Sequence, residues 1–120
     1  MFFMLNLYFL IIINLFFNRS IDVNPAILEL GEVQYNNYYK INFKVINNSK
    51  YVIRINNVIG DCGCLDFKYS KKNIYPGNFL NINGVQKIID TAEFTKNIIV
   101  YTNSKIKPFT VLKIHGKVSL

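Results

Sequence analysis

"YKINFKVINNSKYVIRINNVIGDCGCL", residues 39–65, contains the pattern that decides the fold: apolar and polar residues alternate along two segments. Residues 39–45 form the first segment and residues 51–59 the second. Because successive side chains of a strand point to opposite faces, this alternation predicts two half-buried β-strands. The turn-forming residues 47–50 between them predict that the two strands pair as a hairpin.

Outward from this stretch, the rest of the chain beyond Pro25 has the same period of two, and no window of twelve residues shows a helical stripe. A chain of 120 residues forms one domain. We therefore predict an all-β fold, an immunoglobulin-like antiparallel β-sandwich of six to eight strands over residues 26–118. The further predicted strands cover residues 26–30, 79–83, 94–102 and 109–118, with Pro76-Gly77, Asn83-Gly84, Asn103-Ser104 and Pro108 as turn signals.

The alternation also predicts which side chains lie inside. In each segment the apolar residues occupy one face, and a sandwich buries that face between its sheets. The residues expected inside are Phe43, Val45, Ile53, Ile55, Leu80, Ile82, Ile98, Val100, Leu112 and Ile114.

The N-terminal segment differs from all of this. Residues 1–17 are apolar except for two asparagines, and the first charged side chain is Arg19. This run is shorter than the about 20 residues of a membrane-spanning helix and suits the apolar part of a secretory signal. No basic residue precedes it, and no clear cleavage site follows it. We predict that residues 1–20 are a signal peptide or membrane anchor, and that residues 1–17 form an apolar helix that contacts the membrane.

This segment predicts an exported protein, periplasmic or membrane-anchored in the cell envelope. The formal charge of +7 suggests an anionic partner. However, isoleucine, asparagine and lysine dominate the composition, which is typical of an AT-rich bacterial genome, and the arginines are only Arg19 and Arg54. Coding bias therefore accounts for the lysines, and we expect no nucleic-acid partner.

Several short motifs, taken in order, resemble the bacterial family catalogued as domain of unknown function 1573. The most specific is Cys62-Gly63-Cys64 followed by the turn residues Pro76 and Gly77. The resemblance covers residues 26–118, and it implies an immunoglobulin-like sandwich, often behind a secretion signal, but no activity. Its motifs are "LELGEV" (28–33), "DCGCL" (61–65), "IYPGNFLNI" (74–82), "FTKNIIVYTNS" (94–104) and "LKIHGKV" (112–118).

The pair Cys62 and Cys64 is open to three interpretations. In a strand the two Cα atoms would lie about 6.6 Å apart on one face, close to the about 6.8 Å limit of a disulfide. Gly63 permits a bend that brings the sulfurs together. A structural role, as buried thiols or as a local disulfide, is favoured, because the flanking Asp61 and Asp66 oppose the thiolate that redox chemistry needs.

The second interpretation is a thiol-redox protein, and the third is a copper-handling protein, since two thiolates can hold Cu(I). A structural zinc site needs four ligands, and the chain has two cysteines and one histidine. We expect no metal, and Cys62 and Cys64 stay the alternative functional pair.

An enzyme is not expected. The chain has no Gly-x-Ser-x-Gly elbow, phosphate loop or paired-carboxylate motif. His115 alternates with the apolar residues of its strand, as a surface or cross-strand residue does. We therefore expect no catalytic residue, no cofactor and no small-molecule substrate. The predicted role is a non-enzymatic interaction or structural module that binds an unknown protein partner in the cell envelope, through a sheet edge or through Tyr35, Tyr38 and Tyr39.

Overall fold

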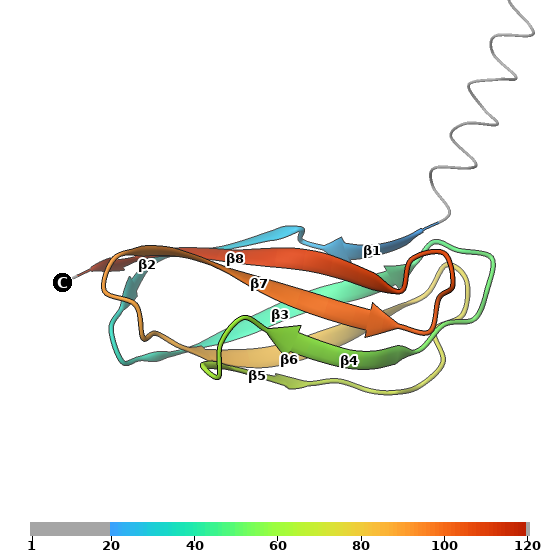
Figure 1. Cartoon of the computed structure of the whole chain (residues 1–120), viewed down its shortest axis with the longest axis horizontal. Helices are drawn as coiled ribbons and strands as arrows, with labels where there is room; N and C mark the ends of the chain where they lie inside the picture. The colour runs from blue at the N-terminus through green and yellow to red at the C-terminus, as the bar shows by residue number, and fades with distance from the viewer. Residues whose placement is uncertain (1–19, 120) are drawn as a thin grey trace, which may run out of the picture.

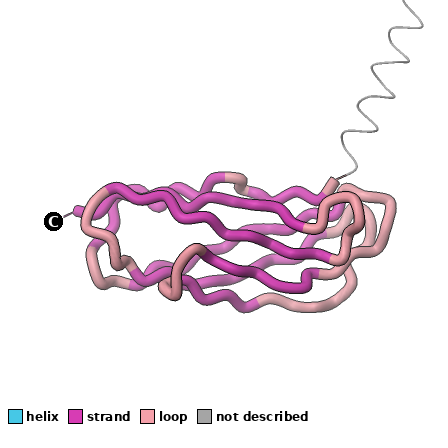
Figure 2. Tube along the Cα trace, in the orientation of Figure 1, coloured by secondary structure: helices cyan, strands magenta, loops and turns pink. Residues whose placement is uncertain are grey.

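The computed structural model describes residues 20–119, which form two four-stranded sheets packed face to face (Figure 1). Sheet A has the strand order β1-β3-β6-β5, and sheet B has the order β2-β8-β7-β4. Figure 2 shows loops joining the strands, with no helix in this part of the chain. The strands are β1 (Ile21–Asn24), β2 (Ile27–Gln34), β3 (Tyr38–Asn47), β4 (Ile55–Gly60), β5 (Leu65–Lys68), β6 (Phe79–Lys87), β7 (Glu93–Thr102) and β8 (Phe109–Ser119).

The predicted immunoglobulin-like sandwich is confirmed, and so is its interior. Nine of the ten residues expected inside are buried, and the tenth, Leu80, is half-buried and packs against the core. The rings of Phe43 and Phe67 meet edge to face, with their centroids 6.4 Å apart. This contact joins the inner faces of β3 and β5.

The predicted hairpin is wrong. β3 pairs with β1 and β6 in sheet A, whereas β4 pairs with β7 in sheet B. The loop at residues 48–54 therefore crosses from one sheet to the other. Alternation shows which face of a strand is buried but not which strand lies beside it. Here the two apolar faces oppose each other across the interior instead of lying side by side.

The first two strands also change sheets, at the cis peptide bond between Asn24 and Pro25. β1 pairs antiparallel with β3, and β2 runs parallel to β8. The predicted sandwich was wholly antiparallel, so this parallel pair is a departure from it. β1 and β5 were not predicted, because four residues are too few for an alternating pattern to stand out.

Asn47 closes the inner face of β3 with a polar side chain that is fully buried. Its Nδ2 donates to the carbonyl oxygens of Tyr51, at 2.7 Å, and Ile74, at 2.8 Å. Its Oδ1 accepts from the backbone N–H of Ser49, at 2.9 Å, and from the Ser49 hydroxyl, at 2.6 Å. Every hydrogen-bonding group of this amide is therefore satisfied, and the crossing loop is held to the end of sheet A.

The predicted signal peptide or anchor, residues 1–20, lies outside the described residues except for Ser20, and so does the predicted helix over residues 1–17. Within residues 20–119, no helix is long and apolar enough to cross a membrane.

Candidate interaction surface and disulfide loop

Cys62 and Cys64 form a disulfide in the loop that joins β4 to β5. Their Cα atoms lie 5.1 Å apart, closer than the spacing in an extended strand. Both side chains are half-buried and pack against the hydrophobic core. In this state neither cysteine has a free thiol to act as a nucleophile or as a copper ligand.

The disulfide loop is hydrogen-bonded to both sheets. The Asp61 N–H donates to the carbonyl of Asn97 on β7, at 3.0 Å, and the Asp61 carboxylate accepts from the Asn97 N–H, at 2.7 Å. The Cys64 carbonyl accepts from the N–H of Lys87 on β6, at 2.9 Å. The loop therefore ties sheet B to sheet A, and the Asp61 carboxylate has a structural partner that the sequence pattern did not reveal.

The two glycines at this loop, Gly60 and Gly63, have different surroundings. Gly63 is exposed, its φ is not positive, and an added Cβ would meet no atom within 4 Å. Gly60, in contrast, lies against Leu65: a Cβ there would sit 2.5 Å from the Leu65 Cδ1. The close approach of β4 to the start of β5 therefore requires glycine at position 60 rather than at position 63.

Pro76 and Gly77 form a turn just before β6. The Asn78 N–H donates to the Tyr75 carbonyl, at 2.9 Å, and Gly77 has a φ of +84°, as the third residue of a type II turn requires. The Gly77 N–H donates to the Asn47 carbonyl, at 2.8 Å. This turn is far in the fold from the cysteines, because it packs on the end of β3, so the two family motifs do not form one site.

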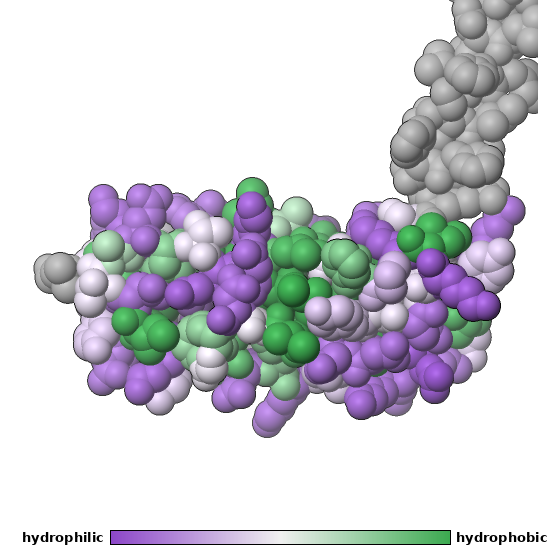
Figure 3. Space-filling model, viewed as in Figure 1, coloured by the Kyte–Doolittle hydropathy of each residue, from purple (hydrophilic) through white to green (hydrophobic). Residues whose placement is uncertain are grey.

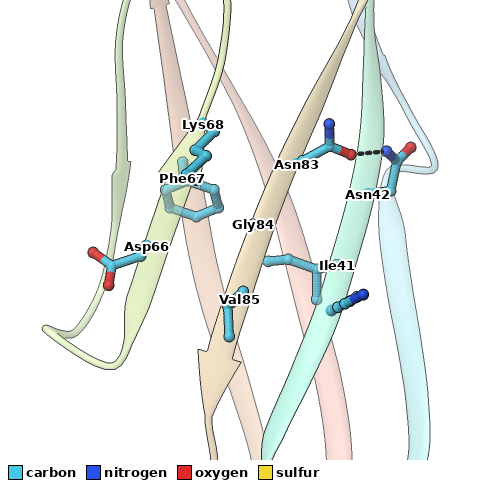
Figure 4. Close-up of a pocket in the computed structure, with 9 residues that line it drawn as sticks. Ile41, Asn42, Asp66, Phe67, Lys68, Asn83, Gly84 and Val85 are labelled. Carbon is cyan, nitrogen blue, oxygen red and sulfur yellow. Dashed lines mark hydrogen bonds between the residues drawn. The ribbon is translucent and has the colours of Figure 1, made fainter.

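The outer face of sheet A is mainly polar. It has a hollow of about 760 Å³ whose lining includes Lys40, Asp66, Lys68 and Asn83 (Figure 4). The amide of Asn42 donates to that of Asn83 across the strands, as Figure 4 shows. The charged groups of the lining are Lys40, Asp66 and Lys68, and the lining contains no histidine, cysteine or hydroxyl group.

The outer face of sheet B has a different character. Figure 3 shows hydrophobic atoms running across the middle of this face. In the strand register Ile59 lies beside Ile99, which lies beside Val111, and Tyr101 lies beside Phe109 with the ring centroids 6.4 Å apart. We call these five residues the sheet B patch. Four of them are exposed, from 37% for Tyr101 to 54% for Phe109, and Ile99 at the centre is half-buried.

Sequence reasoning missed the sheet B patch, although a signal was present. Residues 98–101 of β7 are all apolar, so the alternation fails there and both faces of the strand carry apolar side chains. Of the tyrosines proposed as a binding patch, Tyr35 and Tyr38 are exposed. Tyr39 is half-buried, and its hydroxyl accepts from the Gln34 N–H, at 2.9 Å.

Beyond the sheet B patch, on the same outer face, His115 bridges two carboxylates. Its Nδ1 lies 2.7 Å from Glu29 on β2, and its Nε2 lies 2.6 Å from Glu93 on β7. The hydrogen bonds to Glu29 and then to Glu93 raise the pKa of His115 above its ordinary value of 6.5. Both ring nitrogens are occupied, so His115 is a cross-strand brace, as its position in the sequence predicts.

Metal-binding groups are not gathered anywhere in residues 20–119. No group of three or more His, Cys, Asp or Glu side chains is placed there to hold a metal ion. The two side chains best suited to Cu(I) are joined to each other.

These features define a class of protein: an immunoglobulin-like β-sandwich module with a disulfide loop between its sheets and an apolar patch on one outer face. The chain belongs to the family described as Protein of unknown function (DUF1573), whose model matches residues 21–118. The resemblance inferred from the motifs is thereby confirmed. No curated protein matches the chain at a significant level.

Solved structures share the sandwich. A protein of unknown function from Porphyromonas gingivalis W83 is 15% identical with a TM-score of 0.63, and the match covers 84% of this chain and 46% of that one. The ASH / PapD-like domain 7 of human CEP192 is 5% identical with a TM-score of 0.61, and the match covers 85% of this chain and 87% of that domain. The secreted serine protease VesC from Vibrio cholerae is 13% identical with a TM-score of 0.60, and the match covers 75% of this chain and 21% of the protease.

This chain therefore spans about a fifth of the length of VesC and less than half of the P. gingivalis protein. At these identities the likeness shows the fold alone.

Proposed function

We propose that the protein is a non-enzymatic module of the cell envelope that binds a protein partner through the sheet B patch. The observation that carries the proposal is the apolar row of Ile59, Ile99 and Val111 on an outer sheet face. In a β-sandwich the outer faces meet solvent and normally carry polar residues. A contiguous apolar patch there, with two aromatic rings beside it, is typical of an interaction site.

The surroundings of the sheet B patch indicate the chemistry of the partner. Exposed Lys113 follows Val111 on the outer face of β8, beside Ile27 of β2 and Asn97 of β7. The chain as a whole has a formal charge of +7. Glu29 and Glu93 are exposed on the same outer face, so the rim carries charges of both signs, and the partner that fits best presents an apolar surface whose rim complements both.

The envelope location rests on residues 1–17, whose apolar run suits export or anchoring. The fold is compatible with that location, since the secreted protease VesC contains a similar sandwich. In this proposal residues 1–17 contact the membrane and the sandwich lies on the exported side.

The test compares two lysine substitutions that add the same charge to opposite outer faces. Val111→Lys places the charge in the sheet B patch. Asn81→Lys places it on the outer face of sheet A, at an exposed position of β6. The full chain is crosslinked in cells and purified from envelope fractions, and partners are quantified by mass spectrometry. We expect Val111→Lys to reduce capture of the partner about tenfold or more, as the loss of an interface anchor does, and Asn81→Lys to leave it unchanged.

Unfolding of both purified variants provides the control, because exposed substitutions change stability by only about 0.5 kcal/mol. Equal capture by Val111→Lys and the unchanged protein, with both folded, would overturn the assignment of the binding face.

The alternative, a thiol-redox or copper-handling role for Cys62 and Cys64, has no structural feature in its favour beyond their proximity. Their sulfurs are bonded to each other, and the loop is hydrogen-bonded to both sheets. Thiol titration with and without reductant, together with metal analysis of the purified protein, tests this alternative. Reversible reduction without loss of fold, or stoichiometric copper, would favour it.

A further inference from the structure

Two neighbouring loops at one end of the sandwich carry exposed apolar side chains. They are residues 48–54, between β3 and β4, and residues 103–108, between β7 and β8. Ile106 is 72% exposed, Tyr51 is 65% exposed and Val52 is 44% exposed. Loop tips normally carry small or polar residues, so three exposed apolar side chains at one end need an explanation.

The two loops form one surface. The Asn103 N–H donates to the Arg54 carbonyl, at 3.1 Å, and the Arg54 N–H donates to the Asn103 Oδ1, at 2.7 Å. Tyr51, Val52 and Ile106 all line a hollow of about 390 Å³ between the loops. The apolar side chains of both loops are therefore presented together.

Lysines flank the apolar side chains directly in sequence. Lys50 precedes Tyr51, and Lys105 and Lys107 stand on either side of Ile106. Lys50 and Lys105 are exposed, and Lys107 is half-buried. Neither loop contains an acidic residue. The nearby Asp22 carboxylate accepts a hydrogen bond from the Asn48 amide, at 2.6 Å. We call the two loops with these apolar and lysine side chains the loop tip.

The chain enters the sandwich at the loop tip. The Asn48 N–H donates to the carbonyl of Ser20, the first described residue, at 2.9 Å. Figure 1 shows the described chain starting at the end where the loop between β7 and β8 lies. The apolar run of residues 1–17 is therefore connected through only two residues to the end that carries the exposed apolar side chains.

We propose that the loop tip is a lipid-contacting surface, in which Tyr51, Val52 and Ile106 enter the interface of an anionic membrane. Lys50, Lys105 and Lys107 contact the headgroup phosphates, because apolar tips ringed by lysine suit the boundary between acyl chains and anionic headgroups. The contact orients the sandwich upright on the membrane and leaves the sheet B patch free at the side. This inference rests on the proposed envelope location.

The test uses the absence of tryptophan from the chain. Ile106→Trp introduces one fluorophore in the loop tip, and Tyr35→Trp introduces a control at the exposed turn after β2. Each full-length variant is reconstituted into vesicles of phosphatidylcholine and phosphatidylglycerol that contain brominated lipid. We expect quenching of Ile106→Trp to exceed that of Tyr35→Trp at least about twofold, because only the former reaches the membrane interface. Tyr51→Trp repeats the measurement from the other loop if Ile106→Trp fails to fold.

Flotation of the same vesicles separates this proposal from the envelope location. A chain that floats with the vesicles but shows equal quenching at both positions would overturn the lipid-contacting tip and leave the location standing. A chain that does not float would overturn both. Equal quenching of Ile106→Trp in vesicles of phosphatidylcholine alone would show that the lysines do not contribute, and would overturn the anionic part of the proposal.

Discussion

The outer faces of the two sheets differ although their inner faces are built alike. Sheet A exposes mainly lysines and asparagines, and its exposed rings each have a lysine ammonium over them: Lys44 lies 4.4 Å from the centroid of Phe79, and Lys87 lies 5.8 Å from that of Tyr38. Sheet B exposes the apolar side chains of Phe109 and Val111 on the outer face of β8. Folding requires apolar residues on the inner faces only, and it is indifferent to polar residues outside. Packing of the core therefore does not account for the apolar residues on the outer face of sheet B, and contact with another molecule does.

The inner faces, in contrast, repeat one device. On β6 of sheet A, Gly84 lies under the ring of Phe67, and on β8 of sheet B, Gly116 lies under the ring of Phe94. In both cases the aromatic ring covers the space that a glycine leaves on the inner face. The inner faces of the two sheets are therefore built alike, and the two sheets differ mainly in the side chains on their outer faces.

The largest loss of stability is expected for a substitution on the inner face of β3, compared with one on the outer face of the same strand. Asn47→Ala removes four hydrogen bonds at the end of β3, three of them buried, and leaves the buried Ser49 N–H without its acceptor, so it should lower the free energy of unfolding by about 2–4 kcal/mol. Asn42→Ala, on the outer face of the same strand, should change it by only about 0.5 kcal/mol. Urea unfolding of the two variants measures this difference, and similar losses would contradict the assignment of inner and outer faces.

The paired glycines test how alike the interiors are. A Cβ at Gly84 would lie 2.8 Å from both the Asp66 backbone oxygen and the Phe67 ring, whereas at Gly116 it would meet the Phe94 ring, at 2.7 Å. A ring can shift more easily than backbone. Gly84→Ala should therefore destabilise by about 2–3 kcal/mol and Gly116→Ala by about 1–2 kcal/mol. Thermal unfolding of both variants gives the order, and a larger loss at Gly116 would contradict it.

The disulfide loop joins the two sheets, so its loss should weaken them together. The double substitution Cys62→Ser and Cys64→Ser should lower stability by about 1–2 kcal/mol, at the low end for a disulfide because the closed loop is short. Unfolding followed by probes in each sheet measures this loss, and partner capture at a temperature where the domain is folded should stay unchanged. Lost capture by a folded double variant would revive the thiol alternative.

The smallest effect is expected at His115, on the charged half of sheet B's outer face. Its pKa is raised in the folded protein by the hydrogen bonds to Glu29 and Glu93. A raised pKa means that the stabilisation is fully present below the ordinary value of 6.5 and is lost as pH rises through the folded value. His115→Gln should flatten this dependence. Unfolding curves across that range measure it, and an unchanged slope would show that the brace contributes nothing.

The sequence by itself determined the fold class and the interior, because the period of two in residues 39–45 assigns each side chain to a face without reference to any other strand. It also determined the family, since the Cys62-Gly63-Cys64 motif and the Pro76-Gly77 turn are local features. The same alternation predicted that His115 is a surface or a cross-strand residue, without deciding between the two. The burial of Asn47 could also have been predicted, because Asn47 continues the inward-facing positions of β3. Its polar side chain instead suggested a turn.

Only the tertiary structure decided which strands pair and what the outer faces present. β3 and β4 are neighbours in sequence yet lie in different sheets, because their apolar faces are buried by opposing each other across the core. The sheet B patch joins β4 to β8 through β7, and the loop tip joins residues 48–54 to residues 103–108. Such surfaces depend on contacts between residues that are distant in the chain, so the apolar residues 98–101 indicate that both faces of β7 are apolar but not which residues of β4 and β8 lie beside them.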